Sequence, residues 1–196
     1  GFGQEHGFPV GDALIVEGGG SAVFFAGCGT GCYNTPAGDF TRLRSTGTGT
    51  GLQYLRDFPD SARAEYNYLG QLTRLITRTL DTTSFQYGPW GELREISDPY
   101  RTDGAGAHLK TFFHYDLSHA MAAIQEPGPN NSQSGGRLTT IYVAGDSTLQ
   151  SWTDPDGITT YFGYDGSRRL STITNRRGDV TTLTYNPNSW KLATTV

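Results

Sequence analysis

Two cysteines are the residues of this sequence best suited to covalent or metal chemistry. Cys28 and Cys32 are separated by Gly29-Thr30-Gly31, a spacing that allows a small disulfide ring or half of a metal site. The chain holds no other cysteine, and the nearest histidine along the sequence is His6, so we expect no metal site here. We favour a disulfide formed outside the reducing cytosol, with a pair of free thiols as the alternative.

Histidines and paired aspartates occur where a structural role explains them. The histidines of the middle region come from a turn, a strand and a second turn: His108, His114 and His119. The aspartate pairs occupy turn positions, where an aspartate bonds to nearby backbone: Asp57 with Asp60, and Asp154 with Asp156. We therefore expect no catalytic residue, no cofactor and no metal ion, and we expect that the protein is not an enzyme.

Aromatic side chains form the remaining candidate surface. Three tryptophans fall in different segments and one tyrosine lies in a Thr-rich run: Trp90, Trp152, Trp190 and Tyr161. Packing in a core is one interpretation of such residues. If one face of the protein is left uncovered, they would instead form a binding surface able to stack on sugars or on peptides.

Regularly spaced apolar residues indicate which elements position these side chains. The anchors are Leu72, Leu93, Met121, Leu149, Leu170 and Leu192, at spacings of 21, 28, 28, 21 and 22 residues. An anchor is typically followed by an aliphatic residue or Trp three positions on, then by a turn, a Thr-rich run and a Tyr. A period in this range predicts a repeat architecture.

Each repeat has the pattern of a β-hairpin. Turn residues cluster in Asp154-Pro155-Asp156-Gly157 and in Asn175-Arg176-Arg177-Gly178, and β-branched and aromatic residues flank them. Strand alternation places Thr181, Leu183 and Tyr185 on one face. We expect an all-β fold with almost no helix. The expected hairpin tips lie near Asp60, Asp81, Asp103, Asn130, Asp156 and Arg177.

Spacing within the repeats adds two expectations. Leu170 and Ile173 lie three residues apart, which does not suit one face of a flat strand, so either a β-bulge intervenes or both faces are partly covered. The two longer repeats carry extra residues at 100–108 and at 127–136. We expect these extra residues to project from turn tips, where a stacked array tolerates insertions.

The repeated units resemble a known family. Tyr164-Asp165 to Tyr185 and Leu149 to Tyr164, with Tyr115-Asp116 opening another unit, are similar to the tyrosine–aspartate (YD) repeats of Rhs proteins. Those repeats are related to the repeats of teneurins and of the shell subunit of insecticidal toxin complexes. The resemblance implies a long antiparallel β-sheet strip that curves or spirals as part of a hollow shell around a toxin or other cargo. The units of this chain are too few to close such a shell.

The pattern divides the chain into two regions. Residues 1–56 are expected to form an irregular leading β segment with a Gly-rich loop, and residues 57–196 to form YD-type hairpin repeats that stop midway through a repeat. Both ends of the sequence therefore look like cut points in a longer protein.

Composition restricts the partners that we expect. The net charge of −4 disfavours a nucleic-acid binder, and no apolar run approaches the ~18 residues of a membrane-inserted segment. We expect a structural repeat module of a secreted or cell-surface protein, acting as a scaffold, a shell or an interaction surface. Its partners would be other repeats of the parent chain, further copies of itself, or an enclosed polypeptide. The alternative is a carbohydrate-binding or adhesion module that uses exposed aromatics and long hairpin tips.

Overall fold

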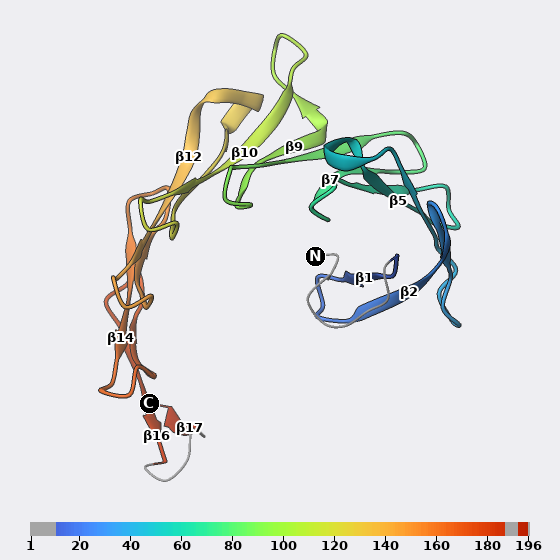
Figure 1. Ribbon diagram of the computed structural model, residues 1–196. Helices are drawn as coiled ribbons and strands as arrows, with labels where there is room; N and C mark the ends of the chain where they lie inside the picture. Colours follow the sequence, from blue (N-terminus) through green and yellow to red (C-terminus); the bar gives the residue numbers. More distant parts are fainter. Residues whose placement is uncertain (1–10, 187–191, 196) are drawn as a thin grey trace. The chain divides into compact units, whose positions relative to one another are not determined.

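The computed structural model describes residues 11–186 and 192–195, and consecutive strands make up most of this span (Figure 1). The strands are β1 (Ala13–Val16), β2 (Ala22–Gly29), β3 (Cys32–Asn34), β4 (Arg42–Thr46), β5 (Gln53–Asp57), β6 (Arg63–Tyr66), β7 (Leu72–Ile76), β8 (Thr82–Tyr87), β9 (Leu93–Thr102), β10 (His108–Tyr115), β11 (Met121–Gly128), β12 (Ser132–Val143), β13 (Leu149–Thr153), β14 (Thr159–Tyr164), β15 (Leu170–Thr174), β16 (Val180–Tyr185) and β17 (Leu192–Thr195). Helix in the described residues is limited to two 3-10 turns, η1 (Gly49–Gly51) and η2 (Pro129–Asn131). The prediction of an all-β fold made of antiparallel hairpins is confirmed.

The chain forms two compact units, which are described separately. The first ends at Thr102 and contains β1 to β9, and the second begins at Asp103 and contains β10 to β17. Within each unit every strand pairs in antiparallel fashion with the next strand along the chain, as in β4–β5 and β13–β14. The change of sequence pattern expected between residues 56 and 57 falls within β5, inside the first unit.

One turn geometry recurs between strands throughout the described residues. In each such turn the first N–H donates to the carbonyl of the fifth residue, and the fourth N–H donates to the carbonyl of the first. The fourth residue has positive φ, as at Gly157 and Gly178. This is the three-residue hairpin loop that ends in a left-handed residue, and its twist suits the flanking strands.

Aspartate or asparagine at the first turn position stabilises many of these loops. The Oδ1 atom of Asp165, for example, accepts hydrogen bonds from the backbone N–H groups of Ser167 and Arg169, at 2.9 and 3.0 Å. The same pair of bonds is made by Asn67, Asp103, Asp116, Asp154 and Asn175. The prediction of turn chemistry is confirmed for Asp154 and for Asp60, whose Oδ1 accepts from the Ala62 N–H. It is wrong for Asp57, which ends β5 and binds Arg44 and Arg63 through its carboxylate.

The hairpin tips lie where the sequence placed them, but neither insertion projects from its tip as expected. Turns or 3-10 residues occur at or beside all six expected tips. Of the insertion at 100–108, the first three residues end β9 and His108 begins β10, which leaves the same turn as elsewhere. The insertion at 127–136, expected as a loop, instead lengthens strands: Gly128 ends β11, Ser132 begins β12, and Pro129–Asn131 alone form the tip. Backbone pairing satisfies the N–H and C=O groups of these residues, which a loop would leave to water.

A register shift accompanies every anchor of the repeat. Each shift falls just before the anchor's cross-strand partner, and the pairs are Tyr66 with Leu72, Tyr87 with Leu93, Tyr115 with Met121, Val143 with Leu149, Tyr164 with Leu170 and Tyr185 with Leu192. In β15 the extra residue lies between Leu170 and Thr172. Leu170 and Ile173 consequently lie on one face of the sheet, the face that also carries their cross-strand partners Tyr164 and Phe162. Of the two explanations of the three-residue spacing, the bulge is confirmed.

Tyrosine hydroxyls bind the backbone of three of the six anchors. Tyr87, Tyr164 and Tyr185 donate hydrogen bonds to the carbonyls of Leu72, Leu149 and Leu170, at 2.9, 2.9 and 2.7 Å. In each case the two residues are 15 positions apart. The recurrence of Tyr and Leu in the sequence therefore reflects a repeated hydrogen bond between a tyrosine hydroxyl and a leucine carbonyl, as well as an apolar contact.

The second unit is a single-layered sheet with two different faces. Cross-strand pairs define a leucine face, on which Thr139, Thr160 and Thr181 accompany the apolar and aromatic residues Phe113, Tyr115, Met121, Ile124, Ile141, Val143, Leu149, Trp152, Phe162, Tyr164, Leu170, Ile173, Leu183 and Tyr185. The opposite side, the threonine face, carries mainly hydroxyl-bearing residues, Thr140, Tyr142, Ser151, Thr153, Thr159, Tyr161, Thr172, Thr174, Thr182 and Thr184, together with the apolar residues Phe112, Leu138 and Val180. In the described residues of this unit every strand belongs to the one sheet, so no second layer within the unit covers the leucine face.

The first unit differs because it has a small core. The cluster consists of Ala13, Ile15, Phe25 and Leu43, with Val23, Tyr33 and Tyr54 packed against it. Leu43 pairs with Arg56 across β4–β5, so Arg56 faces the same side as this core. A charged side chain in that position must be paired, because burying an isolated charge is costly.

Leu80 provides a test of the shared turn geometry. It is the fourth residue of the turn Thr77–Asp81, has φ 70° and is 78% exposed, so it bears the strain of the left-handed region without compensating burial. We expect Leu80→Gly to raise the free energy of unfolding by about 0.5–1 kcal/mol in urea denaturation.

The reverse substitution is the matched control for Leu80. Gly178 holds the same turn position at φ 88°, with open space around its Cα, so Gly178→Leu should lower the free energy of unfolding by about 1 kcal/mol. If both substitutions changed the free energy of unfolding in the same direction, or if neither changed it, the two turns would not share a requirement for a left-handed residue.

Candidate functional site

A cavity of about 650 Å³ in the first unit combines apolar walls with convergent charged groups. Its walls include Ala22, Val23, Phe24, Pro36, Ala37, Phe40 and Pro59. Its polar lining consists of Glu17, Asp39, Thr41 and Arg56. A pocket of this size with a few convergent polar groups is the usual form of a ligand site in proteins.

Arg56 organises the polar side of this cavity. Its side chain is 7% exposed, and its guanidinium donates to Glu17 Oε1 at 3.0 Å, to Asp39 Oδ2 at 3.0 Å and to Thr41 Oγ1 at 2.9 Å. The rings of Phe25 and Phe58 lie 5.7 and 5.1 Å from its guanidinium carbon. Arg56 therefore acts as the centre of a buried network, with its donors directed at protein acceptors.

The two carboxylates of the network are held in their charged forms. Burial acts to raise the pKa of Asp39, but hydrogen bonds from Thr41 and the ion pair with Arg56 outweigh it and lower that pKa. The pKa of Glu17 is lowered by hydrogen bonds from Ser21 and from Arg56. Each carboxylate oxygen has lone pairs beyond those used here, so the cavity can accept further donors from a ligand.

The loop from Thr35 to Thr41 borders the cavity and is fixed by its own hydrogen bonds. Thr35 Oγ1 donates to the Thr41 carbonyl at 2.8 Å, and the Thr41 N–H donates to Asp39 Oδ1 at 2.6 Å. Phe40 lies between these two anchored residues and is 83% exposed. The backbone is thus held while a large apolar side chain points into solvent.

The sequence analysis did not identify this site. Residues 27–51 read as a Gly- and Thr-rich stretch, in which nothing distinguished Asp39 or Phe40 from ordinary loop residues. The one available signal is Arg56, which alternates with the aromatic residues Tyr54 and Phe58 and so falls on a core-facing position. Its partners, brought from residues 15 to 39 positions away, depend on the fold.

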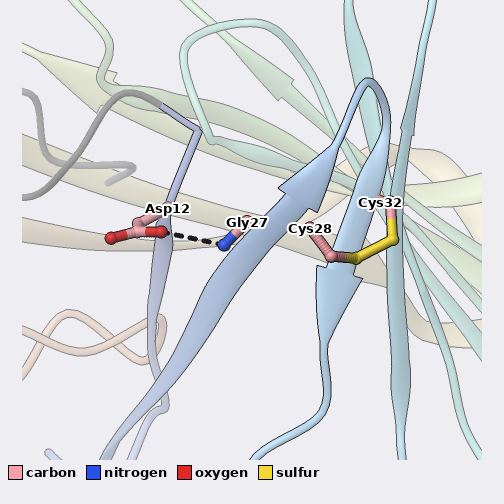
Figure 2. Close-up of a disulfide and its surroundings, with 4 residues drawn as sticks. All are labelled: Asp12, Gly27, Cys28 and Cys32. Atoms are coloured by element: carbon pink, nitrogen blue, oxygen red, sulfur yellow. Dashed lines mark hydrogen bonds between the residues drawn. A yellow bond between two sulfur atoms is a disulfide. The ribbon is translucent and has the colours of Figure 1, made fainter.

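Cys28 and Cys32 form a disulfide at the exposed tip between β2 and β3, with Cα atoms 5.2 Å apart (Figure 2). Beside it, the Gly27 N–H donates to Asp12 Oδ1 at 2.8 Å. Gly27 suits this position because a Cβ atom there would lie 2.7 Å from the Gly11 carbonyl oxygen. Closing a ring this short stabilises the fold by about 2 kcal/mol through chain entropy. Of the alternatives open for these cysteines, the structure has the disulfide.

The aromatic residues predicted as one surface lie on different surfaces. Trp90 occupies a turn of the first unit. In the second unit Trp152 pairs with Thr160, the neighbour of Tyr161, so Trp152 lies on the leucine face and Tyr161 on the threonine face. Trp190 is outside the described residues. Trp152 and Tyr161 therefore cannot line one pocket together.

Trp152 has a smaller cavity of its own, of about 330 Å³. The lining consists of Thr139, Trp152, Asp154, Thr160 and Arg176. Trp152 is 49% exposed and meets Phe162 edge to face, with ring centroids 6.4 Å apart. Arg176 lies 3.5 Å from Asp154, which links two neighbouring turns. The site offers an aromatic face beside hydroxyl, carboxylate and guanidinium groups.

Searches for metal sites and for relatives add no further assignment. In the part of the chain that the structure describes, no set of three or more His, Cys, Asp and Glu side chains is placed to hold a metal ion. Over the same residues, no helix is long and apolar enough to cross a membrane. No model of a protein family matches the sequence, and no curated protein matches it.

The Arg56 network leads to a prediction about pH. Because the folded-state pKa of Asp39 is lowered, its contribution to stability is complete above its unfolded-state pKa and is lost as the pH falls through its folded-state pKa. Asp39→Asn should therefore lower the free energy of unfolding by about 1–3 kcal/mol at pH 7, and this gap should narrow below about pH 4. Urea denaturation between pH 7 and pH 2 measures the gap.

Asp156→Asn is the control for this experiment. Asp156 is exposed in a turn and lies 3.8 Å from Arg176, so its substitution should change stability by less than about 0.5 kcal/mol throughout. A gap between wild type and Asp39→Asn that stays constant from pH 7 to pH 2 would show that the carboxylate charge is unimportant.

Proposed function

We propose that this protein is a structural repeat module of the Rhs or YD type, and that its leucine face serves as a scaffold surface covered by other polypeptide. The observation that carries the proposal is the leucine face of the second unit. Its apolar residues other than Trp152 are partly buried within the single layer, and Trp152 is 49% exposed. Apolar sheet faces are stable when another layer covers them, at about 25 cal/mol per Å² of apolar surface buried.

Repetition of the same local devices supports a scaffold role. The bulge recurs at all six anchors, and the tyrosine–carbonyl bond recurs at three of them, so hairpins can be added without changing the register. Neighbouring turns are also linked by ion pairs, Arg176 with Asp154 at 3.5 Å and Arg168 with Asp146 at 3.9 Å. Exposed pairs of this kind contribute little free energy, but they align successive tips.

The covering polypeptide is proposed to be other repeats of a parent chain, further copies of this chain, or an enclosed cargo. The proposed setting is extracellular or at the cell surface, which the Cys28–Cys32 disulfide supports because disulfides persist in oxidising compartments. In this proposal the protein acts as a scaffold and not as a catalyst.

Adjacent residues of β15 provide a matched test of the scaffold proposal. Ile173 lies on the leucine face and Thr172 on the threonine face, and both are half-buried. We expect Ile173→Lys to weaken retention in the native assembly of the full-length protein by about tenfold or more, because assembly would bury the new charge. Thr172→Lys should change retention by less than about twofold.

Co-purification and light scattering measure retention, and circular dichroism of the isolated chain checks that both variants fold. Equal retention of the two variants, or a loss caused by Thr172→Lys alone, would reject the leucine face as the covered surface.

A second candidate function is carbohydrate binding at the Trp152 cavity. An exposed tryptophan beside two threonine hydroxyls, Asp154 and Arg176 can stack on the apolar face of a sugar ring while binding its hydroxyl groups. On an array of immobilised glycans, Trp152→Ala should then abolish binding.

Tyr161→Ala is the control for carbohydrate binding. Tyr161 is 57% exposed but lies on the opposite face, so its loss should leave glycan binding unchanged. Binding that survives Trp152→Ala, or no binding by the wild-type chain, would exclude this second function and leave the scaffold proposal unaffected.

A further inference from the structure

A buried network of charged groups holds the loop that carries the exposed side chain of Phe40. Asp39 and Thr41, which flank Phe40, both bind the guanidinium of Arg56. Phe40 itself is 83% exposed and gains little from burial in this chain. Rigid, exposed aromatic residues beside a pocket are typical anchors of protein interfaces.

The charge of the cavity determines which ligand fits it. Among the described residues that line the cavity, Arg56 alone is basic, and its donors already meet Glu17, Asp39 and Thr41. The Asp39 side chain is 11% exposed, whereas the Glu17 side chain is 42% exposed, so Glu17 is the carboxylate that a ligand can reach. The site therefore favours a ligand that brings a positive charge and hydrogen-bond donors.

The apolar walls select the form of that positive charge. Phe24 and Phe40 provide aromatic surface in the same cavity as Glu17. A guanidinium is planar, stacks on aromatic rings and binds a carboxylate through two N–H groups, which an ammonium group does less well. At about 650 Å³ the cavity is larger than one side chain, so residues on both sides of the basic residue would lie against Pro36 and Pro59.

We propose that this cavity is a docking site for an arginine side chain of a partner polypeptide, with the guanidinium bound to Glu17 and its aliphatic stem packed on Phe40. The site belongs to the first unit and uses none of the residues of the leucine face. It therefore adds a specific partner contact that is independent of the scaffold function.

A pair of labelled peptides tests the charge requirement. The probes are fluorescein-labelled Gly-Ala-Arg-Ala-Gly and the same peptide with citrulline in place of arginine, which keeps the shape and removes the charge. Fluorescence anisotropy at low salt should show that the arginine peptide binds at least about tenfold more tightly, and that added salt weakens its binding.

Substitutions then test the residues. Phe40→Ala should weaken binding of the arginine peptide about fivefold or more, and Glu17→Gln, which preserves an acceptor for Arg56, about tenfold. Leu117→Ala is the control, because Leu117 is a fully exposed apolar residue of the second unit. It should leave the affinity unchanged.

Several results would overturn the assignment. These are equal binding of the arginine and citrulline peptides, no binding at millimolar peptide, and unchanged affinity in Phe40→Ala. Self-association that Phe40→Ala abolishes, seen by sedimentation without any peptide, would assign the cavity to a second copy of the chain instead.

Discussion

The extra residue beside each anchor is the constraint on which the repeats depend. Side chains alternate along a strand, so without the bulge Leu170 and Ile173 would point to opposite faces. With it, both point to the face of Tyr164 and Phe162. The tyrosine hydroxyl then binds the carbonyl of the preceding anchor, which ties the bulge to the hairpin before it. Every later property of the sheet, including which face is apolar, follows from this register.

The two units meet the cost of an apolar sheet face in different ways. In the first unit β1 and β2 supply Ala13, Ile15 and Phe25 to a core with Leu43. Arg56 faces the same side, where its charge is paired with the carboxylates of Glu17 and Asp39. In the second unit the described strands form one layer, and the leucine face has nothing within the unit to cover it. This difference is the basis of the proposed scaffold role, because such a face gains stability when other polypeptide covers it.

The sequence predicted what depends on local chemistry. Turn positions followed from Asp, Asn and Gly, and the three-residue spacing of Leu170 and Ile173 raised the possibility of a bulge. The opposite orientations of Trp152 and Tyr161 follow from the register of the turn Asp154–Ile158, and knowing its loop type would have revealed them. The Phe40 loop and the partners of Arg56 were not predictable, because they meet through long-range folding and carry no periodic signal. The insertion at 127–136 was expected as a loop from its turn residues, but most of it pairs between β11 and β12 and so extends those strands.

Hydroxyl-radical footprinting of the isolated chain and of the native assembly tests the central claim most directly. The account predicts that Phe162, Trp152 and Tyr164, on the leucine face, lose reactivity on assembly, while Tyr142 and Tyr161 on the threonine face keep theirs. Equal protection of both faces, or protection of the threonine face alone, would contradict the proposal that other polypeptide covers the leucine face in the assembly.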